Sequence, residues 1–186
     1  MSVADERLLE KVARGLNEPW TTGGSAQGSI LSVSASVYGA RPLDETTIPT
    51  GFDPRAAVLF EAIVESAYLV AAADGKLDDD EREAFVQVVI EATGGAVDQR
   101  QIFDLLSDLS DQLQEDGLAG RLEALGRAVL RPEHQREIIR IACLLAQISG
   151  GVSDVERDVL RKICAAFQLP SSEVDTALAA VNSALA

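Results

Sequence analysis

The residue types with the clearest potential chemistry lie in one acidic turn, residues 74–81, with the sequence Asp-Gly-Lys-Leu-Asp-Asp-Asp-Glu. The turn can be aligned with the last eight positions of an EF-hand calcium loop. In that alignment Asp74, Asp78 and Glu81 supply carboxylates at positions 5, 9 and 12, and Gly75 takes the glycine position. Because Ca²⁺ and Mg²⁺ prefer oxygen ligands, these three carboxylates, with a loop carbonyl and waters, are the candidate ligands of a divalent cation.

The EF-hand alignment fails when it is extended backwards. Positions 1 and 3 fall on Val70 and Ala72, which offer no side-chain oxygen, so the turn is not an EF-hand and its cation affinity should be weak. Two other interpretations of the carboxylates stay open. Acidic residues in a first helical turn stabilise the helix dipole by about 0.3–1 kcal/mol each without any metal. An acidic turn can also attract a basic partner protein.

A second, weaker copy of the turn follows at residues 148–160. This copy keeps acidic residues at Asp154 and Glu156, but Ser149 and Ser153 stand where the first copy has aspartates. If a metal ion binds, the first turn should therefore dominate.

The two copies are related by an offset of 75 residues, and four pairs are identical: Gly75 and Gly150, Asp79 and Asp154, Glu81 and Glu156, Arg82 and Arg157. Each copy predicts the same corner, in which a helix ends, a glycine permits the turn and one apolar residue contacts the core.

The next helix in each copy should begin with a capping box. Asp78 or Ser153 is the expected N-cap, and Glu81 or Glu156 completes the box three residues later. The repeat thus predicts two helical hairpins that pack face to face about a pseudo-two-fold axis.

The motif Ala-Asp-Gly-x-(apolar)-x-x-x-Glu-Arg, repeated once with fewer acidic residues, resembles the TerB-like family of bacterial tellurite-resistance proteins. The same fold occurs in the amino-terminal part of the membrane-anchored DjlA-type co-chaperones. The resemblance covers residues 54–186 and implies an all-α bundle, a role in stress resistance, and divalent cation binding at acidic turns. The His-Pro-Asp triplet of a J-domain is absent.

Periodicity supports an all-α fold. Residues 53–186 should form one bundle of about seven helices, and Asp53-Pro54 is a start signal for the first. The expected helices are 53–73, 79–92, 98–114, 119–130, 132–150, 154–167 and 171–184.

Residues 1–52 are expected to form a separate amino-terminal region. It comprises a helix over residues 4–17 and a Gly/Ser-rich linker arm over residues 21–52. Within the arm, residues 30–38 alternate apolar residues with serine as a strand would, but they also fit a short helix, and the pattern alone does not decide between them. We expect a docked helical turn or a partly disordered segment rather than a functional strand. Trp20 should anchor this region to the main body.

Composition excludes several classes of protein. The formal net charge is −14 and the sequence pI about 4.4, so nucleic acid and anionic membrane surfaces should be repelled. We find no signal peptide and no apolar run long enough to span a membrane, which predicts a cytoplasmic protein.

An enzymatic function is not expected. His134 is the single histidine and should be exposed in the first turn of a helix, whereas Cys143 and Cys164 lie within apolar helical patterns as buried small hydrophobes. No nucleophile elbow, zinc-protease motif or phosphate-binding loop occurs. The leading hypothesis is a non-enzymatic, stress-related binding protein.

The alternative hypothesis is a protein-interaction adaptor whose acidic turns only cap helices. The sequence feature that suggests this hypothesis is the arm, in which the expected contact residues are Trp20, Ile30, Leu31, Val37 and Tyr38. Protein partners are expected in either case, and the sequence leaves the partner and the oligomeric state open.

Overall fold

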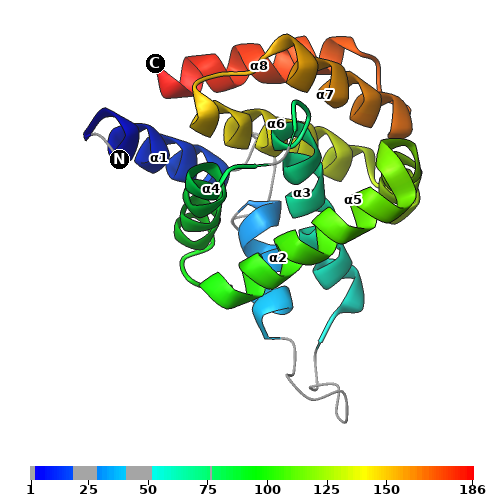
Figure 1. Cartoon of the computed structure of the whole chain (residues 1–186), viewed down its shortest axis with the longest axis horizontal. Helices are drawn as coiled ribbons and strands as arrows, with labels where there is room; N and C mark the ends of the chain where they lie inside the picture. Colours follow the sequence, from blue (N-terminus) through cyan, green and yellow to red (C-terminus); the bar gives the residue numbers. More distant parts are fainter. Residues whose placement is uncertain (1–2, 19–28, 41–51, 76) are drawn as a thin grey trace.

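The computed structural model describes residues 3–18, 29–40, 52–75 and 77–186. This part of the chain is all-α, with eight α-helices, one short 3₁₀-helix and no strand. In chain order the elements are α1 (Val3–Asn17), α2 (Ile30–Gly39), α3 (Pro54–Ala71), α4 (Asp79–Ala92), α5 (Gln99–Ala128), α6 (Pro132–Leu145), the 3₁₀-helix η1 (Ala146–Ser149), α7 (Asp154–Ala166) and α8 (Ser172–Leu185) (Figure 1).

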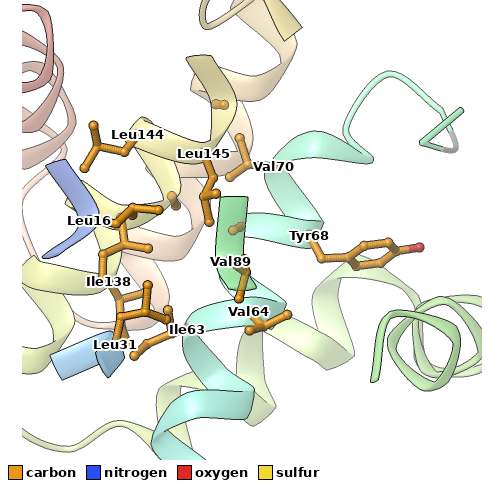
Figure 2. Close-up of a cluster of buried hydrophobic side chains, with 14 of the residues drawn as sticks. Leu16, Leu31, Ile63, Val64, Tyr68, Val70, Val89, Ile138, Leu144 and Leu145 are labelled. Atoms are coloured by element: carbon orange, nitrogen blue, oxygen red, sulfur yellow. The ribbon is translucent and has the colours of Figure 1, made fainter. Parts of the chain in front are cut away.

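Helix α3 is the centre of the bundle. It packs against α2, α5, α6 and α7, and every residue from Ala62 to Val70 is buried. A helix that is buried on all sides needs an apolar surface nearly all round, and this one provides it. The surrounding core draws large side chains from α1, α2, α4 and α6 (Figure 2), among them Leu16, Leu31, Val89 and Ile138.

The segment 30–38, for which both strand and helix were open, is helical. Ser29 caps α2 by accepting a hydrogen bond from the Ser32 amide at 3.3 Å. Along the helix, Ser34 Oγ donates to the Ile30 carbonyl at 2.6 Å. Serine hydroxyls can thus be satisfied within a helix, so their alternation with apolar residues did not require a strand.

Two helices expected from the sequence meet at a kink within α5. Residues 98–114 and 119–130 both belong to α5, which continues through a kink at Gly117. Gly117 has φ 67° and ψ 168°, a conformation that glycine adopts without a steric penalty. With α5 counted as two helical segments on either side of Gly117, the described residues after 53 form the seven α-helices that the sequence predicted.

Residues of α1 and α2 share the core with the later helices, since Leu16 and Leu31 are fully buried in it. The division of the chain at residue 52 stays a prediction. Trp20 and the rest of 19–28 lie outside the described residues, so its anchoring role also stays a prediction.

Candidate functional site at two helical corners

The first corner joins α3 to α4. Asp78 is the N-cap of α4, and its Oδ1 accepts a hydrogen bond from the Glu81 amide at 2.8 Å. Glu81 reaches back, so that its Oε2 accepts from the Asp78 amide at 3.2 Å. The capping box predicted for this corner is confirmed.

The second corner joins η1 to α7 in the same way. Ser153 Oγ accepts from the Glu156 amide at 3.3 Å, and Glu156 Oε2 accepts from the Ser153 amide at 2.7 Å. Glu156 is buried, whereas Glu81 is partly exposed. The second capping box is also confirmed, and its buried glutamate has a structural role.

The two corners lie against each other. A small hollow of about 20 Å³ between them is lined from the first corner by Leu77, Glu81 and Phe85, and from the second by Ile148 and Ser149 among others. A space of this size holds about one water molecule. Its walls are mainly apolar, so the corners are joined by packing.

The capping boxes bear directly on cation binding. One oxygen each of Asp78 and Glu81 is used to cap α4, and Asp74 is exposed. Across the described ranges, no group of three or more His, Cys, Asp or Glu side chains is arranged to hold a metal ion. The residues of the first corner therefore do not form a prebuilt metal centre, and the ligand set Asp74, Asp78 and Glu81, like the weaker set Asp154 and Glu156, stays a prediction.

The two corners differ most in charge. Asp79, Asp80 and Glu83 are exposed on the first turns of α4, and Asp74 follows the C-terminus of α3, where the helix dipole is negative. Within the described ranges, none of these four carboxylates forms an ion pair. The first corner thus concentrates more negative charge than its capping box requires.

A comparison with protein families identifies the chain. The model of the family described as tellurite resistance protein TerB matches residues 60–179, well over half of the sequence. The chain belongs to the TerB family. No curated protein and no solved structure gives a significant match.

The match confirms the resemblance drawn from the corner motif. It begins within α3 and ends within α8, so that both corners of this TerB-family chain fall inside it. Helices α1 and α2 precede it. No helix in the described ranges is long and apolar enough to cross a membrane.

Two buried ion pairs were not predicted from the sequence of this TerB-family chain. Glu65 on α3 pairs with Arg121 on α5, with 2.6 Å between Oε1 and Nε. Glu137 and Arg140 pair within α6, and both side chains are 7% exposed. A glutamate inside the continuous apolar run of α3 was the signal for the first pair, because a buried charge needs a partner.

Three further side chains with reactive groups, Cys143, Cys164 and His134, lie on α6 and α7. Burial raises the pKa of Cys143 to about 12 and that of Cys164 to about 11, and both thiols are fully buried, as predicted. His134 is half-buried, so the expectation of an exposed histidine was wrong. Burial lowers its pKa, with a smaller contribution from Arg131.

Proposed function

We propose that this TerB-family chain is a non-enzymatic binding protein and that its first corner, residues 73–81, takes up a divalent cation such as Ca²⁺ or Mg²⁺. The observation that supports the proposal is the charge difference between two corners built on the same capping box. At the second corner Ser153 and Glu156 cap a helix whose first turn carries two acidic residues, Asp154 and Glu156, against three in the first turn of α4. At the first, exposed carboxylates gather without a counter-ion among the described side chains, and a cation would relieve their repulsion.

The residues that would hold the ion are Asp74, Asp78 and Glu81. Each carboxylate in the capping box has a second oxygen that the box does not use, and Asp74, four residues before Asp78, is exposed. Since the described residues do not form a prebuilt site, binding has to order the corner. We therefore expect weak affinity, with a Kd of about 1 mM, the range of flexible sites with few charged ligands.

The wider role follows from the family. We place this binding function in tellurite or related stress resistance on the strength of the family description alone. The cytoplasmic location stays a prediction. We also propose that the two corners belong to a duplicated helical hairpin, α3–α4 and α6–α7. Their shared capping boxes and the offset of 75 residues support this interpretation.

A thermal shift experiment tests cation uptake. With a Kd of about 1 mM, 10 mM Ca²⁺ would stabilise the protein by about 1.4 kcal/mol. This corresponds to a rise in Tm of about 3–6 °C for a chain of this size. The double variant Asp74→Asn with Glu81→Gln should abolish the rise.

The substitution Glu81→Gln separates cation binding from capping. Gln101 already completes a capping box with Asp98 at the start of α5, its Oε1 accepting from the Asp98 amide at 3.0 Å. A glutamine at position 81 should therefore keep the cap while it removes the charge. The matched control Asp154→Asn, in the second corner, should leave the Tm rise intact. An unchanged Tm at 10 mM Ca²⁺ and 10 mM Mg²⁺ would contradict the proposal.

The same experiment bears on the adaptor alternative, in which the acidic corners only cap helices. One feature favours an interaction role for α2. Residues 19–40 contain no charged residue, and Val33 is 48% exposed on this helix. If the protein is an adaptor, Ca²⁺ and Mg²⁺ should not shift its Tm. Val33→Asp should then reduce binding to a purified partner without changing the Tm.

A further inference from the structure

The chain contains two Asp-Gly dipeptides, Asp74-Gly75 in the first corner and Asp116-Gly117 within α5. An Asp-Gly dipeptide can rearrange without an enzyme. The main-chain nitrogen of the glycine attacks Cγ of the aspartate, an oxygen leaves that carbon as water together with the amide proton, and a five-membered succinimide ring closes. Glycine permits this attack because it has no Cβ to hinder the approach and because its backbone adopts many conformations.

The ring opens again when water attacks one of its two carbonyl carbons. Attack at Cγ restores the aspartate. Attack at the main-chain carbonyl carbon breaks the bond from that carbon to the glycine nitrogen and gives isoaspartate, in which the chain runs through Cγ. One water is lost and one is gained, so the mass does not change. The main chain becomes one carbon longer, and the carboxylate is then attached directly to Cα.

The first dipeptide has few restraints among the described residues. Asp74 lies between α3 and α4, it is exposed, and its carboxylate forms no hydrogen bond or ion pair with any described residue. Gly75 is exposed as well, and no described heavy atom lies within 4 Å of the position that a Cβ would take. The Gly75 amide donates a hydrogen bond to the Ala72 carbonyl at 3.2 Å. Single hydrogen bonds in exposed turns open readily, which frees the nitrogen for attack.

The second dipeptide is held in place. Gly117 is as open as Gly75, but the Asp116 carboxylate accepts a hydrogen bond from Arg121 Nη1 at 3.0 Å, and Arg121 is bound to Glu65 in turn. Asp116 is also helical, because Gly117 is the residue of α5 with non-helical backbone angles. Ring closure requires Cβ and the glycine nitrogen to eclipse each other about the Cα–C bond, and a helical ψ of about −42° keeps them apart.

We propose that Asp74-Gly75 is a modification site at which isoaspartate forms spontaneously, while α5 and Arg121 protect Asp116-Gly117. The modification has a consequence for the first corner. Asp74 is one of the three proposed cation ligands, and isoaspartate at this position carries its carboxylate on a shorter arm from a longer main chain. Cation uptake should therefore be lost as the protein ages. This consequence rests on the proposed function, whereas the formation of isoaspartate does not.

Prolonged incubation of the full chain tests the modification. The protein is kept folded for several weeks at physiological temperature and neutral pH, and is then digested with trypsin, which separates the two dipeptides into peptides 56–76 and 101–121. Fragmentation mass spectrometry distinguishes isoaspartate from aspartate in each peptide. Because α5 has to open before Asp116 can react, isoaspartate should form at position 74 at least about tenfold faster than at position 116.

Two controls test the structural explanation. In denaturing urea the two dipeptides should react at similar rates, because the ion pair and the helix are lost. Asp74→Glu should stay unmodified at position 74 while it keeps the negative charge, because its longer side chain would have to close a less favourable six-membered ring. Equal rates at positions 74 and 116 in the folded protein, or no isoaspartate at position 74 after the incubation, would overturn the proposal.

Thermal shift of the aged protein tests the consequence. A sample in which most molecules carry isoaspartate at position 74 should lose most of the Tm rise that Ca²⁺ gives to fresh protein, whereas aged and fresh Asp74→Glu should give the same rise. An isoaspartyl methyltransferase with S-adenosylmethionine should restore the rise, because the methyl ester that it forms leaves as methanol when the ring closes again, and water then regenerates aspartate.

The two proposals fail in different ways. A Tm rise that persists in protein modified at position 74 would overturn the link between isoaspartate and cation uptake. No Tm rise in fresh protein would overturn cation uptake and, with it, this consequence. The yields of isoaspartate at positions 74 and 116 would still decide whether the first corner is a modification site, since they are measured without a cation.

Discussion

Arg140 on α6 donates a hydrogen bond from Nη1 to the main-chain oxygen of Gly15 on α1, over 2.8 Å. Its Nη2 donates to the Glu18 carbonyl at 3.1 Å, and its Nε donates to Glu137 Oε2 at 3.1 Å. One buried guanidinium thus holds the C-terminal carbonyls of α1 and is neutralised within its own helix. A cation favours the negative end of a helix dipole, so this contact fixes α1 to the bundle electrostatically as well as by packing.

Arg140→Ala should destabilise the protein strongly. It would leave Glu137 buried without its partner and the end of α1 without a donor, and breaking a buried pair in this way costs about 3–5 kcal/mol. Arg136→Ala is the matched control, one turn earlier on α6, where the pair with Glu173 is more exposed and should contribute less than about 1 kcal/mol. Urea unfolding at neutral pH gives both values, and a loss below about 1 kcal/mol at Arg140 would refute the capping role.

Gly39→Ala should lower the free energy of unfolding much more than Gly15→Ala. At the end of α2, a Cβ atom on Gly39 would lie 1.8 Å from the Ala96 carbonyl oxygen, so backbone has to move, at a cost of about 1–3 kcal/mol or more. A Cβ on Gly15 would lie 3.2 Å from Leu144 Cδ2, the end of a flexible side chain. An alanine there also gains up to about 1 kcal/mol of helix propensity. Denaturant midpoints compare the two, and similar losses would contradict the close approach of α2 to Ala96.

The corners could be predicted from the sequence because a capping box is local. The N-cap and the third residue of the helix are three apart, so Asp78 and Glu81, or Ser153 and Glu156, specify their own hydrogen bonds. The same locality limited the cation prediction. Spacing shows which carboxylates a turn contains and which of them cap the helix, but not whether their remaining oxygens converge on one point.

Features that depend on distant residues were missed. Glu65 and Arg121 are 56 positions apart, and neither segment contains a sequence pattern that predicts this pairing. The helical state of α2 was likewise left open. The contact of Tyr38 with Phe60 on α3, with 4.7 Å between ring centroids, shows that tertiary packing supports this helix. In a serine-rich segment, local hydrogen bonding does not favour helix or strand, so packing against other elements decides the conformation.

The stability of the protein should depend on pH through Glu65. Burial raises the pKa of its carboxyl, Arg121 opposes the shift, and Glu61 and Asp116 add to it. Because the folded-state pKa lies above the unfolded value, the folded state binds the proton more tightly. The stability that protonation contributes is fully present below about pH 4.5 and is lost as pH rises through the folded-state pKa.

Glu65→Gln provides the comparison for this titration. The free energy of unfolding of the wild type, minus that of the variant, should fall between about pH 4 and pH 8. Urea unfolding across this range measures it. Glu123→Gln, an exposed glutamate on α5, should give a flat difference. A difference for Glu65→Gln that rises with pH would show that the pair with Arg121 outweighs burial, and the sign of the shift would then be wrong.

The two thiols should be unreactive in the folded protein. With pKa values of about 12 and about 11, Cys143 and Cys164 are thiolates in only about 0.01% and 0.1% of molecules at pH 8. The thiolate is the reactive form, and both side chains are fully buried, so labelling by iodoacetamide requires the bundle to open. Mass spectrometry should detect no adduct after an hour on the native protein and two adducts in 8 M urea. Labelling of either cysteine within minutes under native conditions would mean that α6 or α7 opens locally, and thiol chemistry would then have to be considered for this TerB-family chain.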